Sequence, residues 1–159
     1  ANKKDSSVME SFVNNALNTV PDLIGGKYAL GLPGFSTKGK IFLYSARSYA
    51  LAGNFDKAHN LLSKIESDRF YKEGIIDVLY LQAKSNKPET TDLSINILNL
   101  GGKIIDNKFI GDIATILSIS GDIDNSLKIV KKMKFSVDLT QTLINLAKEI
   151  NPQQEDPLI

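Results

Sequence analysis

The chain has 159 residues, of which 42% are hydrophobic and 23% charged, and its formal net charge is +1. This composition is that of a globular domain with a core of its own, and the balanced charge creates no global attraction to nucleic acid or anionic membranes. With no cysteine and a single histidine, His59, the chain cannot form disulfides, thiolate metal sites or a histidine-rich metal cluster.

The start of the chain leaves the compartment open. "ANKKDSS" suits the polar start of an exported protein after leader removal, and it equally suits a trimmed cytoplasmic protein. No apolar run approaches the roughly 20 residues that a membrane-spanning helix needs. We therefore expect no membrane span.

Apolar residues at helical spacing predict helices along the whole chain. After a polar lead-in at 1–6, Val8, Phe12 and Val13 share one face of a first helix that ends at Pro21. A long glycine- and proline-rich loop is expected at 21–37. Later helices are expected between Thr37 and Gly53, at 55–65, at 70–84, from 91 or 92 through 98, around 109–117, at 123–134 and at 137–150, before a loose tail at 152–159.

The chain lacks the alternating pattern of strands, except weakly at "KYALGLP". We therefore expect an all-α fold of seven or eight helices, with one helical domain over 7–151.

A helix-glycine-helix pattern occurs twice. "ARSYALAGNFDKAHNLLSKI" begins at Ala46, and "ATILSISGDIDNSLKIVKKM" begins 68 residues later at Ala114. In each, a glycine can adopt the left-handed conformation that ends a helix. The following Asn54 or Asp122 can cap the next helix, and a small residue then allows the two helices to pack closely. The pattern predicts two helical hairpins.

The two segments resemble tetratricopeptide (TPR-like) repeats, because 68 residues is twice the family's period of about 34. The first unit, at about 40–68, matches the family pattern at Phe42, Ala46, Tyr49, Gly53, Asn54, Phe55, Ala58, Leu62 and Ile65. The second unit, at about 107–135, matches it at Ile110, Ala114, Leu117, Gly121, Asp122, Ile123, Ser126, Val130 and Met133. A middle unit, at about 73–106, follows from the spacing alone and matches poorly.

This resemblance implies a right-handed α-solenoid of antiparallel helix pairs and a non-catalytic scaffold that binds a partner protein or peptide. The groove would be lined by the first helix of each pair. It would carry Lys40, Leu43, Arg47, Ala50, Leu51, Lys108, Thr115 and Ser118. The family's clamp for C-terminal carboxylates is not matched, because only Lys40 and Arg47 are suitably placed cations.

Two alternatives remain open. Gly34–Lys40, "GFSTKGK", fits most of a phosphate-binding loop, but Ile41 replaces the Ser or Thr that holds magnesium. The chain could instead be a structural subunit that self-associates or joins a larger assembly. We expect no enzyme activity, cofactor, metal or nucleic acid.

A basic stretch lies at "KIVKKMK", residues 128–134. Its lysines are compatible with a nucleic-acid or lipid surface. A solvated helix face is favoured, because the stretch contains no aromatic residue on which a base could stack.

Overall fold

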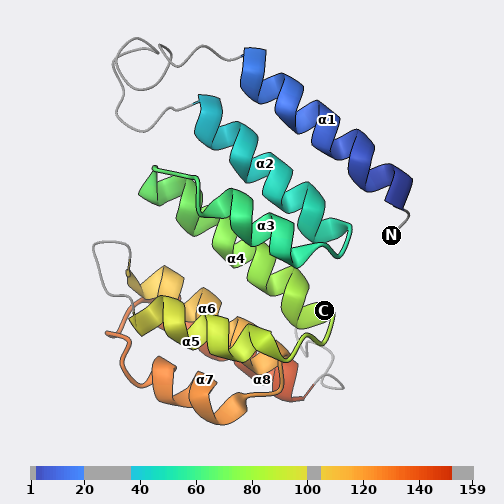
Figure 1. Ribbon diagram of the computed structural model, residues 1–159. Coiled ribbons are helices and arrows are strands. Elements are labelled where there is room, and N and C mark those ends of the chain that lie inside the picture. Colours follow the sequence, from blue (N-terminus) through green and yellow to red (C-terminus); the bar gives the residue numbers. More distant parts are fainter. Residues whose placement is uncertain (1–2, 20–36, 100–104, 152–159) are drawn as a thin grey trace, which may run out of the picture. The chain divides into compact units, whose positions relative to one another are not determined.

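A computed structural model describes residues 3–19, 37–99 and 105–151 of the protein, and all of its regular structure is helical (Figure 1). This confirms the all-α class. The eight helices of the described residues are α1 (Lys3–Thr19), α2 (Thr37–Leu51), α3 (Phe55–Leu62), α4 (Asp68–Lys84), α5 (Glu89–Asn99), α6 (Asn107–Ile119), α7 (Ile123–Val130) and α8 (Val137–Ile150).

The helices form two compact units, Ala1–Val78 and Leu79–Ile159. Helix α4 begins in the first unit and ends in the second. The single domain predicted over 7–151 and the middle repeat predicted at 73–106 therefore stay predictions. Most of the expected loop at 21–37 and all of the tail at 152–159 lie outside the described residues.

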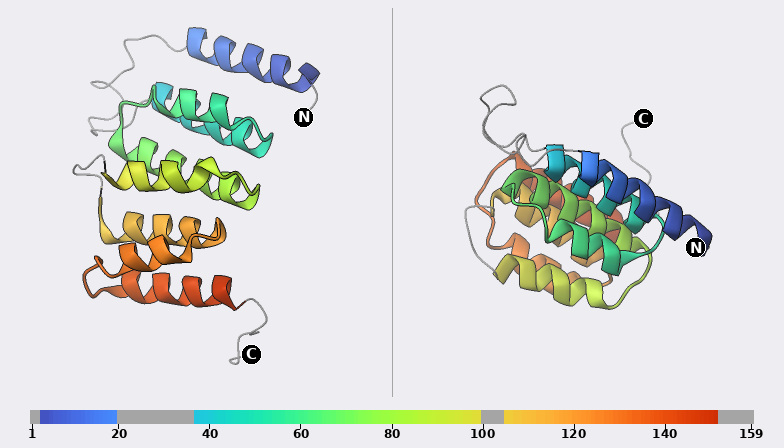
Figure 2. Two further views of the ribbon diagram at one scale, coloured as in Figure 1. Left: turned by 60° about the horizontal axis from the view of Figure 1, so that its bottom comes forward. Right: turned by 45° about the horizontal axis from the view of Figure 1, so that its top comes forward.

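In the first unit, α2 packs against α3 after a short turn, and α1 lies alongside α2 (Figure 1). In the second unit, α6 packs against α5, α7 and α8 (Figure 2). The core of the first unit includes Ala46, Ala58, Leu62 and Val78, each at most 1% exposed.

Residues 37–78, here called the first copy, and residues 105–146, the second copy, share their turn geometry. Gly53 and Gly121 have φ of 77° and 85°, as the repeat predicts. The amides of Asn54 and Asp122 donate to the carbonyls of residues 68 apart, Tyr49 at 2.8 Å and Leu117 at 2.9 Å. Their side chains cap α3 and α7 by accepting from the amides of Lys57 and Asn125. The sequence repeat therefore corresponds to a repeated turn structure in the two copies.

Several helix ends differ from the predicted ones. Helix α1 begins at Lys3, inside the predicted polar lead-in. Helices α3 and α7 end at Leu62 and Val130, because the next turn is closed by tighter bonds, such as those from the amides of Ile65 and Met133 to carbonyls three residues before. Ile65 and Met133 remain buried, so the shorter helices keep the predicted core.

The copies differ where helices approach closely. Gly74 on α4 faces Leu62 on α3 and Leu43 on α2: a Cβ at Gly74 would overlap Cδ2 of Leu62 and lie 2.8 Å from Cδ1 of Leu43. In the second copy the large and small residues are exchanged, because Gly111 takes the place of Leu43 and Thr142 that of Gly74. A Cβ at Gly111 would overlap Oγ1 of Thr142. At each close approach a glycine therefore lies against larger side chains of its neighbours.

Candidate functional site: a cleft beside the first helix

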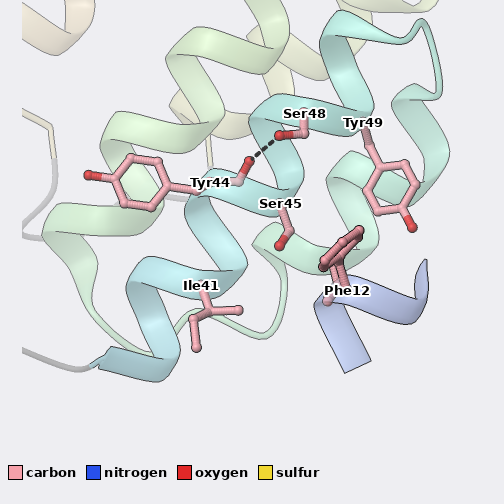
Figure 3. Close-up of a pocket in the computed structure, with 7 residues that line it drawn as sticks. Phe12, Ile41, Tyr44, Ser45, Ser48 and Tyr49 are labelled. Carbon is pink, nitrogen blue, oxygen red and sulfur yellow. Dashed lines mark hydrogen bonds between the residues drawn. The ribbon is translucent and has the colours of Figure 1, made fainter. Parts of the chain in front are cut away.

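The first unit has a mainly apolar cleft between α1 and α2, with a volume of about 380 Å³. Its lining is Phe12, Val13, Ile41, Tyr44, Ser45, Ser48 and Tyr49. Figure 3 shows Phe12 projecting from α1 toward the part of α2 that carries Ser45 and Tyr49.

Two aromatic side chains of this cleft are open to solvent. Phe12 is 72% exposed and Tyr44 is 59% exposed. The Ser48 hydroxyl donates to the Tyr44 carbonyl of its own helix at 3.0 Å (Figure 3). The lining is thus mainly apolar, and it offers an aromatic surface to a ligand rather than a set of polar groups.

The apolar face of α1 was predicted from the sequence, and its exposure was not. The predicted apolar face of this helix is largely open to solvent: Val8 is 52% exposed, Phe12 is 72% exposed, and Val13 is partly buried. Helical spacing identified the amphipathic face, but spacing cannot show whether the rest of the chain covers it. This is why sequence reasoning missed the cleft.

Helix α1 also contacts α3 across a second cleft of about 350 Å³, which shares Val13 and Tyr49 with the first. Glu10 on α1 accepts a hydrogen bond from Lys57 on α3, and this bond raises the pKa of Lys57. The Lys57 ammonium lies 5.5 Å from the centre of the Tyr49 ring. Burial, with the charge of Glu10, raises the pKa of Tyr49.

The predicted groove residues of the first unit fall into two groups. Leu43 and Ala50 are buried in the core, at 1% and 3% exposure, so their side chains cannot line a groove. Close packing of α2 on its neighbours explains this correction, since Leu43 faces Gly74. Leu51 is 73% exposed, and Lys40 is half-buried.

Arg47, the central cation of the predicted groove, forms two ion pairs within the first unit. Its guanidinium donates to Glu73 at 2.7 Å and to Asp77 at 2.5 Å, both on α4. Burial lowers the pKa of Arg47, but the bonds to the two carboxylates outweigh it and the pKa is raised. Arg47 therefore links α2 to α4.

The predicted groove residues of the second unit lie on α6. Lys108 pairs with Asp112 at 2.8 Å, and this bond raises the pKa of Lys108. The Thr115 hydroxyl donates to the Gly111 carbonyl at 3.0 Å. Ser118 is 8% exposed, and its hydroxyl has no partner among the described residues. That these residues share one groove with those of the first unit stays a prediction.

The residues that suggested phosphate binding are only partly described. Gly34 to Ser36 lie outside the described residues, and Lys38, Gly39 and Lys40 belong to the first turns of α2. The part of the chain that the structure describes contains no strand to support a phosphate-binding loop and no cluster of three His, Asp or Glu residues that could hold a metal. None of its helices is long and apolar enough to cross a membrane.

Comparison with protein-family models, curated proteins and solved structures finds no match. The tetratricopeptide resemblance therefore rests on the residues of the two copies.

Proposed function

We propose that the protein is a non-catalytic interaction scaffold that binds an apolar segment of a partner protein in the cleft between α1 and α2. The observation that carries the proposal is the exposure of two aromatic side chains, Phe12 and Tyr44, on one apolar cleft. Exposed aromatic residues of this kind are typical anchors of protein–protein interfaces. A partner that covered them would remove apolar surface from water.

The arrangement that we propose for the helices is a right-handed, TPR-like solenoid of antiparallel pairs. The support is the recurrence, 68 residues apart, of the same turn glycine, the same helix cap and the same backbone hydrogen bonds. In such a fold Lys40, Arg47, Lys108 and Thr115 would face a groove that could extend the interface.

The cleft can be tested with peptides selected on the protein from a displayed library. We expect Phe12→Ser and Tyr44→Ser each to weaken binding of a selected peptide roughly tenfold, since loss of an aromatic anchor typically costs more than about 1 kcal/mol. Phe135→Ser is the matched control, because Phe135 is 93% exposed and lies on the second unit. If neither cleft variant lowered the affinity of the selected peptides, this site would be refuted.

Arg47→Glu is a poor probe of binding. It would place a third carboxylate beside Glu73 and Asp77, so any loss of affinity could reflect disruption of the contact between α2 and α4. Leu43→Asp has the same defect, because it would bury a charge in the core.

A second candidate function, a subunit of an assembly, is favoured by the surface of α8. Leu143 and Ile144 are 48% and 44% exposed, whereas Ile75, which corresponds to Leu143 in the first copy, is 2% exposed. If this face is an assembly interface, sedimentation will show a concentration-dependent oligomer that Leu143→Ser disperses. A monomer at all concentrations would rule out self-association.

A further inference from the structure

The turn between α7 and α8 ends in two large apolar side chains that face solvent. Phe135 is 93% exposed and Val137 is 85% exposed, more than any other large apolar side chain among the described residues. Ser136 between them caps α8 by accepting a hydrogen bond from the amide of Leu139. The turn is therefore a structured tip with an apolar end.

Four lysines precede this tip in the sequence. Lys131, Lys132 and Lys134 are exposed and form no ion pair with any described residue, and Lys128 is exposed one turn earlier on α7. The Cα atoms of the three nearest lysines lie within about 15 Å of that of Phe135, because the chain spans at most about 3.8 Å per residue.

Between residues 123 and 138 the acidic residues are fewer than the lysines, and Asp106 lies next to Asn107, whose side chain donates to the Lys134 carbonyl at 3.1 Å. Asp124 lies in the first turn of α7 and Asp138 in the first turn of α8. The negative charge of Asp138 also acts on Lys108 of α6. Four lysines against two aspartates leave residues 123–138 with a net positive charge.

The first copy shows that the fold does not require these residues. At the positions 68 residues earlier, Phe135 and Val137 correspond to Ser67 and Arg69, while Lys131 and Lys134 correspond to Ser63 and Glu66. The corresponding turn has the same backbone hydrogen bonds, such as that from the amide of Ile65 to the carbonyl of Leu62. Lys132 corresponds to Lys64, so the apolar end and the other lysines are the additions to a common turn.

We propose that the turn between α7 and α8 binds the surface of a bilayer that contains anionic lipid. The end of the turn carries Phe135 and Val137, which would enter the interfacial region, and the lysines would lie beside the lipid phosphates and carboxylates. Exposed apolar side chains and a basic cluster together are the two signals that stable peripheral binding needs. Ile123 and Leu127, 36% and 40% exposed, extend the apolar surface along α7.

Co-sedimentation with vesicles tests this proposal. We expect the protein to bind vesicles of phosphatidylcholine with phosphatidylserine and not to bind vesicles of phosphatidylcholine alone. Binding should weaken as the salt concentration is raised. Lys131→Ser should lower the partition coefficient roughly fivefold, and Phe135→Ser should lower it roughly tenfold or more. Both substitutions introduce the residue of the first copy, and far-UV circular dichroism will show that the fold is kept.

A fluorescent variant reports insertion directly. The protein has no tryptophan, so Phe135→Trp introduces a single probe at the tip, and Phe12→Trp introduces one on α1 as the matched control. We expect a blue shift with anionic vesicles for the tip probe alone. Absence of vesicle binding, an unchanged emission of the bound tip probe, or binding to single-stranded RNA in place of vesicles would each overturn the proposal. None of these results depends on the peptide cleft, since Phe12→Ser should bind vesicles like the unaltered protein.

Discussion

Ser126 and Ala58 occupy the same position in the two copies, and both are fully buried between helices. The Ser126 hydroxyl donates to the Ala114 carbonyl on the neighbouring helix at 2.7 Å. Ala58 cannot form this bond. A small side chain is thus the shared requirement at this position, and the hydrogen bond is particular to the second copy.

We expect Ser126→Ala to lower the free energy of unfolding by about 1 kcal/mol, because a buried hydrogen bond is lost. Urea titration followed by circular dichroism will measure this. Ser63→Ala is the control, since the exposed Ser63 hydroxyl donates only to Asn60 of its own helix end, and surface changes usually stay within about 0.5 kcal/mol. Equal losses in the two variants would contradict the role of the bond between α6 and α7.

Gly121 gives a second prediction at this scale. Its φ of 85° is costly for a residue with a Cβ, and a Cβ there would meet nothing within 4 Å. We expect Gly121→Ala to cost about 1–2 kcal/mol from backbone strain alone. Gly121→Asn should cost less, since asparagine tolerates this region, as Asn86 does here with φ of 54°. The same urea titration tests both variants, and a larger loss for asparagine would refute backbone strain as the cause.

At the scale of helices, the contact between α6 and α8 depends on matched sizes at Gly111 and Thr142. We expect Gly111→Ala to cost about 1–3 kcal/mol through overpacking. Thr142→Ala should cost about 1 kcal/mol, because the hydroxyl also donates to the Asp138 carbonyl at 2.7 Å.

The double variant isolates the contact. Once the hydroxyl is absent, the nearest remaining atom to the new Cβ, Cβ of residue 142, lies 3.4 Å away. The double variant should therefore be more stable than the sum of the single losses predicts, by about 1 kcal/mol. If the losses in the free energy of unfolding measured by urea titration were strictly additive, the side chains at positions 111 and 142 would not be in steric conflict.

Local chemistry made most helices predictable. Gly53, Gly121, Asn54 and Asp122 were identified from the sequence, and the structure confirms their turn and capping roles. Helix α5 begins at Glu89, earlier than predicted, directly after Pro88, and proline is well suited to the start of a helix. The exposure of α1 was not predictable, because burial depends on which helices cover it rather than on its own periodicity.

At the scale of the whole molecule, the all-α class followed from the sequence, but the site did not. Leu43 and Ala50 had the spacing of groove residues and lie in the core. Arg47 had the charge of a ligand contact and is bound to Glu73 and Asp77. A family pattern places side chains on a face of a helix, but the pairing of those side chains depends on residues distant in the sequence.

The nucleotide alternative also belongs to this scale. We expect calorimetry with ATP or GTP and magnesium to show no heat of binding, because Lys40 lies within helix α2 and the described residues provide no strand behind it. Lys40→Ala is the control. Binding heat that disappears in this variant would restore the phosphate-binding interpretation of Gly34–Lys40.

A chain that contains two similar sets of helices can misfold by exchanging partners between them. The swapped sizes at Leu43 and Gly74, and at Gly111 and Thr142, act against this. If α2 paired with α8, Leu43 would meet Thr142 and the helices would be forced apart; if α6 paired with α4, two glycines would face each other across a void. The differences between the copies thus favour correct pairing during folding, which identical copies could not do.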